Sequence, residues 1–479
     1  MSASSDRPLV PEWLAAPADA NKLAEAVWPV SATRDAHGEV SFGGVAASAL
    51  RERFGTPLYV LDEDAVRARA REVRGAFEDA AARHGIRARV FYASKAFLST
   101  EIVRWVTAEG LAVDVATGGE LAVALAADAD PARLGLHGNN KSTTELERAV
   151  EIGIGSIVVD SEIELERLAA IAERHGAGRA DAEPQNVLIR VNTGVHAETH
   201  AFLATAHEDQ KFGFSLEDAP AIAARIGELS SLRLVGLHCH IGSQIFGSAG
   251  FAESASRLVE LYADLRAAGA DLTVLNLGGG FGIAYTSVDT PTPIAELATG
   301  IVDAVARECE VRGVPLPNLA FEPGRAIVGR AGVTLYEVGT VKPVRVSDDL
   351  TRLYVSVDGG MSDNARHALY GADYSARIVS RTSDAEPALA RVVGRHCESG
   401  DIVVDAEYLP ADVAPGDLLA VPATGAYCFS LASNYNYVPR PPVVALRGGE
   451  ARVIVRGESI DDLLARDAGI PTERSEVHG

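Results

Sequence analysis

Short apolar runs alternate with amphipathic helical segments across the middle of the chain, and this alternation constrains the fold more than any other feature. Eight runs, each bounded by turn residues, have the length and composition of strands. They begin at Arg89, Leu111, Leu134, Ser156, Asn186, Arg233, Thr273 and Asn318. Two intervening segments, STTELERAVEIG and SEIELERLAAIAERHG, open with the Ser and following Glu of a capping box, which indicates a helix start. Eight strands alternating with helices favour an α/β fold of the (β/α)8 TIM-barrel type over an open doubly wound sheet.

The pattern changes after Arg325, where strands follow one another with little helix between them. Such a series is typical of a β-sandwich or β-barrel, so we expect a mainly β C-terminal domain over residues 329–479, after a barrel over residues 62–328. Residues 28–61 contain the strand-like stretches GEVSFGG and TPLYVL, and we expect this segment to join the β domain. Residues 1–27, rich in Ala, Pro and Ser, are expected to be a partly mobile extension.

Charge and cysteine content narrow the class of partner. The 44 basic and 66 acidic residues of this 479-residue chain give a net charge of −22, which opposes binding to nucleic acid or to an anionic membrane. The four cysteines form no CxxC pair and no zinc-ligand spacing, which favours a reducing compartment and a site without metal. No signal-peptide pattern opens the chain, and no stretch approaches the ~20 apolar residues that span a bilayer. We therefore expect a cytoplasmic protein that acts on a small molecule.

Polar and glycine residues collect where the expected strands end. In a (β/α)8 barrel the active site lies at the carboxyl ends of the strands, so these residues are the first candidates for a site. They are Lys95 after strand one, Asp114 in strand two, His137 and Asn139 after strand three, His240 and Ser243 after strand six, Gly278, Gly279 and Gly280 after strand seven, and Glu322 and Arg325 after strand eight.

Lys95 stands in VFYASKAF, between a buried-strand pattern and a helix. A lysine amine among apolar neighbours such as Phe91, Ala93 and Ala96 becomes a nucleophile that can form a Schiff base with an aldehyde. The alternative is a lysine that extends from a strand end into solvent or pairs with Asp114.

The run LGGGFGI lets backbone amides approach an anion closely, although a simple tight turn has the same pattern. Arg325 on the neighbouring strand end favours a phosphate there, whereas Ile283 breaks the dinucleotide spacing and HGNNKS lacks the ending of a P-loop. Glu322 could pair with a protonated ring nitrogen or with Arg325, and His240 could stack on a flat ring or belong to the core. A lysine, a phosphate cradle, a carboxylate and a histidine on one rim together describe a site for pyridoxal phosphate.

Eight motifs then carry a resemblance to a known family. In chain order they are FYASKAF, DVATGGEL, HGNNKS, HCHIGSQI, LGGGFGI, EPGRAIV, CESGD and GAYCFSLASNYN. Together they resemble the diaminopimelate decarboxylase family, in the alanine racemase-like, fold-type III group of pyridoxal phosphate enzymes, over residues 28 to 465 or so. The resemblance implies a barrel followed by a β domain and the decarboxylation of meso-2,6-diaminopimelate to L-lysine and CO2, the last step of bacterial-type lysine biosynthesis.

The resemblance also implies roles for individual residues. Lys95 would carry the cofactor, His240 would stack on its ring and Glu322 would pair with its ring nitrogen. The other implied cofactor residues are Asp114, Ser243, Gly278, Gly279, Gly280, Gly324, Arg325 and Tyr427, and the implied substrate residues are Arg325, Arg366, Tyr370, Glu398 and Tyr427. Within CESGD, Cys397 is a candidate proton donor, and this segment reaches the partner subunit's site in the family, which implies a homodimer.

Substrate selectivity is expected at the end of the substrate that does not react. Arginine binds carboxylates through two parallel hydrogen bonds, so Arg366 suits the distal carboxylate and Glu398 the distal ammonium. An amino acid racemase and a non-catalytic cofactor-binding protein are the competing functions on this fold; the small non-catalytic relatives lack a long β domain, which this chain has.

One stretch, GVHAETHAFLATAHEDQKFGF, contains three histidines without a supporting ligand pattern. We interpret it as a mobile loop over the site and not as a metal centre; the histidines are His196, His200 and His207.

Overall fold

The structure is a computed structural model that describes residues 9–179, 182–195, 211–347 and 350–470. The chain divides into two compact units. The β unit comprises Met1–Ala65, Ala284–Asp289 and Gly329–Gly479, and the barrel unit comprises Val66–Ile283 and Thr290–Val328. The short segment after the glycine run, Ala284–Asp289, thus belongs with the β unit although barrel segments flank it on both sides. None of the described helices is both long and apolar enough to cross a membrane.

The barrel unit is built on eight parallel strands that close on themselves. In order around the barrel they are β5 (Ala88–Ala93), β6 (Ala112–Val115), β7 (Leu134–Leu136), β8 (Ser156–Val159), β9 (Gln185–Arg190), β10 (Leu232–His238), β11 (Val274–Asn276) and β12 (Asn318–Phe321). The expected (β/α)8 fold is confirmed. Side chains fill the barrel interior, as the buried contact among Phe91, Ala112 and Ala320 shows, so the barrel is a packed core and not a pore.

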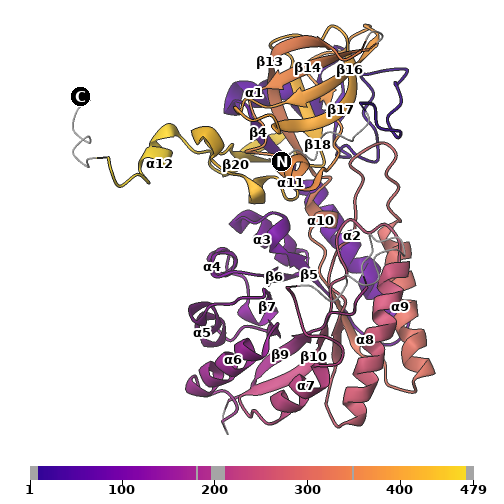
Figure 1. Ribbon diagram of the computed structural model, residues 1–479, viewed down its shortest axis with the longest axis vertical. Helices are drawn as coiled ribbons and strands as arrows, with labels where there is room; N and C mark the ends of the chain where they lie inside the picture. The colour runs from indigo at the N-terminus through magenta and orange to yellow at the C-terminus, as the bar shows by residue number, and fades with distance from the viewer. Residues whose placement is uncertain (1–8, 180–181, 196–210, 348–349, 471–479) are drawn as a thin grey trace. The chain divides into compact units, whose positions relative to one another are not determined.

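Helices surround the strands (Figure 1). They are α2 (Glu63–Ala82), which precedes the barrel strands, and α3 (Thr100–Ala108), α4 (Gly118–Ala126), α5 (Thr143–Glu151), α6 (Glu162–Arg174), α7 (Ala219–Gly227), α8 (Ala249–Ala267), α9 (Ile294–Val311) and α10 (Arg325–Val328), with the 3-10 turns η1 (Ser94–Ala96) and η2 (Pro131–Arg133). Phe77 of α2 stacks on Phe321 of β12 with ring centroids 3.9 Å apart, which packs the first helix against the last strand.

The two expected capping boxes differ in outcome. At α5 the Ser142 side chain accepts from the Glu145 amide and Glu145 bonds back to Ser142, so this box is complete. At α6 the Ser161 side chain accepts from the Glu164 amide, but the Glu164 carboxylate accepts from Lys141 Nζ at 2.8 Å. The second box is therefore half formed, because a buried cation outcompetes the backbone for the carboxylate.

The β unit is organised around a nine-stranded sheet. Its main path runs β17 (Ile402–Pro410), β16 (Pro387–Val393), β14 (Thr351–Val357), β13 (Gly332–Arg345), β4 (Leu58–Asp62), β19 (Val443–Arg447) and β20 (Glu450–Val455), and β18 (Leu418–Pro422) pairs with both β13 and β15 (Arg377–Ile378). Because β4 pairs with β13 and β19, the N-terminal segment joins the C-terminal sheet as expected.

The remaining elements of the β unit are short. They are a separate three-stranded sheet of β1 (Thr33–Arg34), β2 (Val40–Phe42) and β3 (Val45–Ala46), the helices α1 (Ala47–Phe54), α11 (Arg366–Tyr370) and α12 (Ile460–Leu464), and the 3-10 turns η3 (Phe429–Leu431) and η4 (Tyr435–Tyr437). The Arg34 guanidinium donates to the Arg381 and Ile378 carbonyls at 3.0 and 2.9 Å, which ties the small sheet to the C-terminal part of the unit. The expected mobility of residues 1–27 falls partly on residues 1–8, which lie outside the described residues.

Asp363 is a buried carboxylate that joins three parts of the β unit. Its Oδ1 accepts from the Tyr336 hydroxyl of β13, its Oδ2 accepts from the Gly360 amide at 2.8 Å, and its carbonyl accepts from the Tyr59 hydroxyl of β4 at 2.6 Å. Burial raises the pKa of Asp363 to about 7, although the hydrogen bonds from Tyr336 and Gly360 oppose the rise. The folded state therefore retains a proton on Asp363 that the unfolded chain releases above about pH 4.

This proton predicts a pH effect on stability. Between about pH 4 and 7 the folded chain binds more protons than the unfolded chain, so Asp363 weakens folding as pH rises. Asparagine has nearly the same shape as aspartic acid but does not titrate, so Asp363→Asn should remove this contribution. We expect calorimetry to show the melting temperature of the wild type falling relative to that of Asp363→Asn between pH 5 and 8. Asp384→Asn, at an exposed position of the same unit, is the control and should follow the wild type.

Candidate active site

Lys95 lies in η1, directly after β5, where the chain turns outward from the barrel. Its neighbours Ala93 and Ala96 are buried, yet the Lys95 side chain is exposed. The expectation that apolar neighbours would enclose the amine is therefore not met in this structure. Asp114 is not within ion-pair distance, and the Lys95 ammonium has no hydrogen bond to any residue in the described ranges. An uncommitted amine at the end of a barrel strand remains available to react with an aldehyde.

Glu322 follows β12 and is held by side chains from three other strand ends. Asn276, the last residue of β11, donates from Nδ2 to Oε1 at 2.6 Å. His238, the last residue of β10, places Nε2 3.2 Å from Oε1, and His137, after β7, places Nε2 3.4 Å from the same oxygen. In the described part of the chain no lysine or arginine approaches Glu322 within 4.0 Å, and Arg325 instead donates to Ser243 Oγ at 2.9 Å.

The two buried acids of this rim are driven toward opposite protonation states. Burial raises the pKa of Asp114 well above its usual range, the charge of Glu322 raises it further, and Lys95 opposes the rise. Burial would also raise the pKa of Glu322, but the imidazoles of His137 and His238 more than offset this effect and lower it well below its usual range. Glu322 is therefore the acid that stays ionised and Asp114 the one that takes up a proton. A buried carboxylate without a full cationic partner fits a protonated ring nitrogen.

Burial acts on two histidines of this rim as well. Burial lowers the pKa of His137 to about 3, and burial together with Lys95 lowers that of His240 to about 3, so both imidazoles are neutral near pH 7. His240 Nδ1 accepts from the Gly279 amide at 3.3 Å, which leaves the proton on Nε2. A neutral imidazole fixed through one nitrogen offers its ring face to a flat ligand.

The glycine run after β11 is packed so closely that side chains cannot replace its hydrogens. A Cβ at Gly279 would lie 2.1 Å from the Glu322 carbonyl oxygen, and Gly280, at φ +109°, would place one 2.4 Å from the Gly242 carbonyl oxygen. The Ile245 amide donates to the Gly280 carbonyl at 2.9 Å, and the Gly282 amide donates to the Ile245 carbonyl at 3.0 Å. These bonds join the loops after β10 and β11 into one rigid cradle of bare backbone, which fits the phosphate of a cofactor.

Gly324 performs a similar packing role against η1. A Cβ at this position would lie 2.9 Å from both the Ala93 carbonyl oxygen and the Ala96 Cβ. The loop after β12 can therefore approach η1 only because residue 324 is glycine.

The expected substrate residues lie in the β unit. Arg366, in α11, is 7% exposed, and its Nη1 donates to the Tyr374 hydroxyl at 2.6 Å. Its guanidinium carbon lies 4.6 Å from the Tyr285 ring centroid, and no carboxylate pairs with it in the described ranges. Tyr370, at the other end of the same helix, is 69% exposed. Tyr427 has φ +62°, a left-handed conformation that a tyrosine adopts only where the surrounding structure enforces it.

The CESGD segment presents two side chains on a braced loop. Cys397 and Glu398 are exposed, while the buried Asp401 accepts from the Met361 and His396 amides at 2.6 and 2.7 Å. The Glu398 carboxylate accepts from the Gly400 amide at 3.2 Å, and this bond is the main cause that lowers the pKa of Glu398. The loop backbone is therefore fixed while its functional groups remain accessible.

Several residues of the rim were not singled out from the sequence. His238 stands two residues before His240, and the alternation of side chains along a strand places both on the same face. Asn276 is the polar last residue of an apolar strand, and this position could also have marked it as a site residue. Arg190 ends β9, is 14% exposed, and lies 3.8 Å from Asp160 Oδ2.

His137, His238 and Glu322 also bring three donor atoms within 4.8 Å of one another, close enough for a metal ion. Asn276 already donates to Glu322 Oε1, so this oxygen is engaged in a hydrogen bond within the protein. The three histidines His196, His200 and His207 lie outside the described residues.

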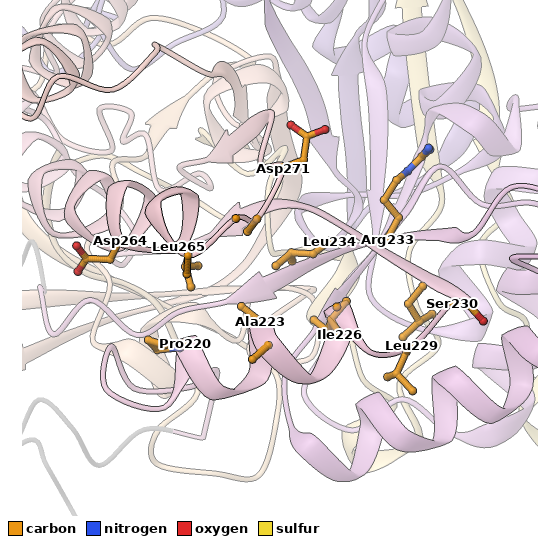
Figure 2. Close-up of a pocket in the computed structure, with 16 residues that line it drawn as sticks. Pro220, Ala223, Ile226, Leu229, Ser230, Arg233, Leu234, Asp264, Leu265 and Asp271 are labelled. Atoms are coloured by element: carbon orange, nitrogen blue, oxygen red, sulfur yellow. The ribbon is translucent and has the colours of Figure 1, made fainter.

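A pocket of about 560 Å³ lies elsewhere in the barrel unit, between α7, α8 and the start of β10 (Figure 2). Its lining is mostly apolar, with Arg233, Asp264 and Asp271 among its polar residues. The rim residues gather at the carboxyl end of β10, about 20 Å along the strand from this pocket. It is therefore not part of the candidate active site.

Comparison with known proteins shows the family of the chain. Residues 64–329 match the family described as "Pyridoxal-dependent decarboxylase, pyridoxal binding domain". The chain is 53% identical to a diaminopimelate decarboxylase of Mycobacterium tuberculosis over 92% of this chain and 98% of that protein, and 43% identical to the one of Bacillus subtilis over 91% and 97%. A crystal structure of diaminopimelate decarboxylase from "m. jannaschii in co-complex with L-lysine" superposes with a TM-score of 0.85 at 30% identity, covering 92% of this chain and 98% of that one. The chain belongs to the diaminopimelate decarboxylase family of pyridoxal phosphate-dependent enzymes.

Proposed function

We propose that this protein decarboxylates meso-2,6-diaminopimelate to L-lysine and CO2 with pyridoxal phosphate as cofactor, as the last step of lysine biosynthesis. The observation that carries the proposal is that one barrel rim presents both the uncommitted Lys95 amine and the buried, ionised Glu322 carboxylate. The family membership of the chain supports the same reaction, and the names of the relatives indicate the substrate.

The residues of the rim fit the cofactor group by group. Lys95 would hold its aldehyde carbon, His240 would face its ring, and Glu322 would accept a hydrogen bond from its protonated ring nitrogen. When bound, pyridoxal phosphate supplies an electron sink for the electron pair left by the departing CO2. The remaining proposed cofactor residues are Asp114, Ser243, Gly278, Gly279, Gly280, Gly324, Arg325 and Tyr427.

Glu322 would keep the ring nitrogen protonated because the carboxylate stays ionised in a buried environment. Asn276, His137 and His238 hold the carboxylate in place, so its orientation does not depend on the ligand. Asp114, with its raised pKa, would add no second negative charge beside the cofactor when protonated.

Substrate recognition would depend on the β unit. Arg366 is a buried cation with aromatic neighbours and no carboxylate partner in the described ranges, so a substrate carboxylate would offset the cost of burying its charge. Glu398 is exposed and ionised and would bind the distal ammonium. Arg325, Tyr370 and Tyr427 complete the proposed set, and the exposed Cys397 thiol would return a proton to the carbon that loses CO2.

We further propose a homodimer, in which the CESGD loop of one subunit serves its partner's site. The exposure of Cys397 and Glu398 supports this, as do the exposed apolar side chains Leu369, Tyr370 and Tyr437 of the β unit.

The residue boundaries proposed for the domains are 28–61 with 329–479 for the β domain and 62–328 for the barrel. A cytoplasmic location is supported by the four cysteines, all described, none of which forms a disulfide.

The reaction can be tested directly on the purified protein loaded with pyridoxal phosphate. We expect CO2 and lysine to appear in equal amounts from meso-diaminopimelate. Lys95→Ala should abolish this activity and the visible absorbance of the bound cofactor, because the amine that holds the aldehyde is gone. Lys342→Ala, at an exposed position of β13, is the matched control. Exchange of the α-hydrogen without CO2 release would indicate a racemase instead.

Replacing Glu322 tests the proposed role of its charge. Glutamine can still accept a hydrogen bond from Asn276 but carries no charge, so Glu322→Gln should lower kcat by about 100-fold or more. The cofactor should still bind, and its absorbance maximum should shift because the ring nitrogen loses its proton. Glu173→Gln, an exposed glutamate of α6, should behave as the wild type. A variant with normal kcat would remove Glu322 from this role.

Assembly can be measured independently of activity. We expect sedimentation velocity to give the mass of two chains. Mixing an inactive Lys95→Ala chain with an inactive Glu398→Ala chain should restore part of the activity, because one hybrid site then receives both intact residues. A monomeric active enzyme would contradict the proposed shared site.

A further inference from the structure

Four buried groups of the β unit form a closed circuit of hydrogen bonds around Arg366. Arg366 Nη1 donates to the Tyr374 hydroxyl at 2.6 Å, and the Tyr374 hydroxyl lies 3.6 Å from Cys428 Sγ. The Cys428 thiol donates to Asn364 Oδ1 at 3.6 Å, and Asn364 Oδ1 also accepts from the Arg366 amide at 3.4 Å. The circuit therefore begins at the side chain of Arg366 and ends at its backbone.

The direction of each bond follows from the donors present. A guanidinium has only donors, so the Tyr374 oxygen must accept from it, and the tyrosine proton is then directed to the Cys428 sulfur. Burial raises the pKa of Tyr374 well above its usual range, with Cys428 and Tyr285 adding to the rise, so the hydroxyl retains that proton. Tyr374 is 1% exposed and Asn364 and Cys428 are 0% exposed, so water does not compete for these bonds.

Aromatic rings restrict the same guanidinium from the side. Its central carbon lies 4.6 Å from the Tyr285 ring centroid and 5.5 Å from that of Tyr374. The two rings meet edge to face with centroids 5.1 Å apart. Tyr285 belongs to the segment Ala284–Asp289, which is braced where the Asp289 carboxylate accepts from the Tyr285 and Thr286 amides at 2.9 and 2.8 Å.

We propose that Tyr374 and Cys428 are positioning residues for substrate specificity: their hydrogen-bond circuit holds Arg366 in the one orientation in which its remaining donors can bind the distal carboxylate of the substrate. This inference rests on the proposed function, since it assumes that Arg366 binds that carboxylate. Neither residue needs to touch the substrate.

The circuit also reaches a second proposed site residue. Cys428 directly follows Tyr427, whose left-handed backbone, at φ +62°, needs a firm anchor. The bonds of Cys428 to Tyr374 and Asn364 supply that anchor. Arg366 and Tyr427 are thus oriented by one set of buried groups, although 60 residues separate them in the chain.

Two ligands that differ in the distal carboxylate test this inference through their binding affinities. The product L-lysine retains the amino and carboxylate groups of the unreacted end, whereas cadaverine has the same carbon chain and both amines without a carboxylate. Arg366 should therefore make the protein loaded with pyridoxal phosphate bind L-lysine more tightly than cadaverine. Titration calorimetry of both ligands measures this preference without any turnover.

We expect Tyr374→Phe to weaken L-lysine binding by about tenfold, because a buried guanidinium donor loses its acceptor, and to leave cadaverine binding unchanged. In the decarboxylation assay KM should rise while kcat changes little. Cys428→Ala should have a smaller effect in the same direction, and Cys428→Ser should restore binding, since a hydroxyl can both accept from Tyr374 and donate to Asn364. The absorbance of the bound cofactor should remain that of the wild type in each variant.

Two controls separate this inference from its premise. Tyr262→Phe removes a tyrosine hydroxyl that donates to the Pro315 carbonyl at 2.9 Å in the barrel unit, and it should leave both affinities unchanged. Arg366→Gln should abolish the preference for L-lysine. Suppose that Arg366→Gln abolishes the preference for L-lysine but Tyr374→Phe leaves it intact. The positioning role of Tyr374 is then overturned, while the role of Arg366 stands. If Arg366→Gln keeps the preference for L-lysine, the role of Arg366 and the positioning role are both overturned. If Tyr374→Phe weakens the binding of L-lysine and of cadaverine equally, the positioning role is also overturned.

Discussion

Closure of the barrel by the pairing of β12 with β5 is the constraint on which the candidate site depends. Phe321 pairs in register with Val90, and the Ala93 amide donates to the Pro323 carbonyl at 3.2 Å just beyond the paired residues. The last strand thereby delivers Glu322 to the rim where the first strand delivers Lys95, although more than 200 residues of chain lie between them. An open sheet of the same strands would leave the amine and the carboxylate at opposite edges.

Burial and the neighbouring side chains give the two acids of this rim, Glu322 and Asp114, different protonation states. Glu322 and Asp114 experience the same loss of solvent, but they differ in their partners among the described residues. Glu322 accepts from Asn276 at Oε1 and lies 3.3 Å from His238 Nε2 at Oε2, whereas Asp114 has only His137 Nε2, 3.4 Å from its Oδ1. Glu322 consequently carries the negative charge, whereas Asp114 takes up a proton and is neutral. The rim can thus offer a single anionic position to a ring nitrogen without the repulsion that two adjacent carboxylates would cause.

Much of the fold could be predicted from the sequence because its signals are local. Strand starts such as those at Ser156 and Asn318 agree with the structure to the residue, since apolar runs bounded by turns are enough to define them. The second capping box is only half formed because the partner of the Glu164 carboxylate is Lys141, which no local pattern reveals. The same limit applies to the site. The position of Lys95 was clear from its strand, whereas the circuit through Tyr374, Cys428 and Asn364 joins residues whose proximity only the folded sheet creates.

Lys141 shows how the fold limits side reactions at a site that handles an aldehyde. It follows β7 close to His137, is 2% exposed, and directs its three ammonium hydrogens to the carbonyls of Gly138 and Val158 and to Glu164 Oε1 at 2.8, 2.6 and 2.8 Å. To attack a carbonyl carbon this amine would have to give up all three acceptors, one of which is its buried counter-ion Glu164. Lys141 and Lys95 both stand near the ends of barrel strands, and the fold buries the amine of one and exposes that of the other. Selectivity between two identical amines is therefore achieved without any difference in side-chain type.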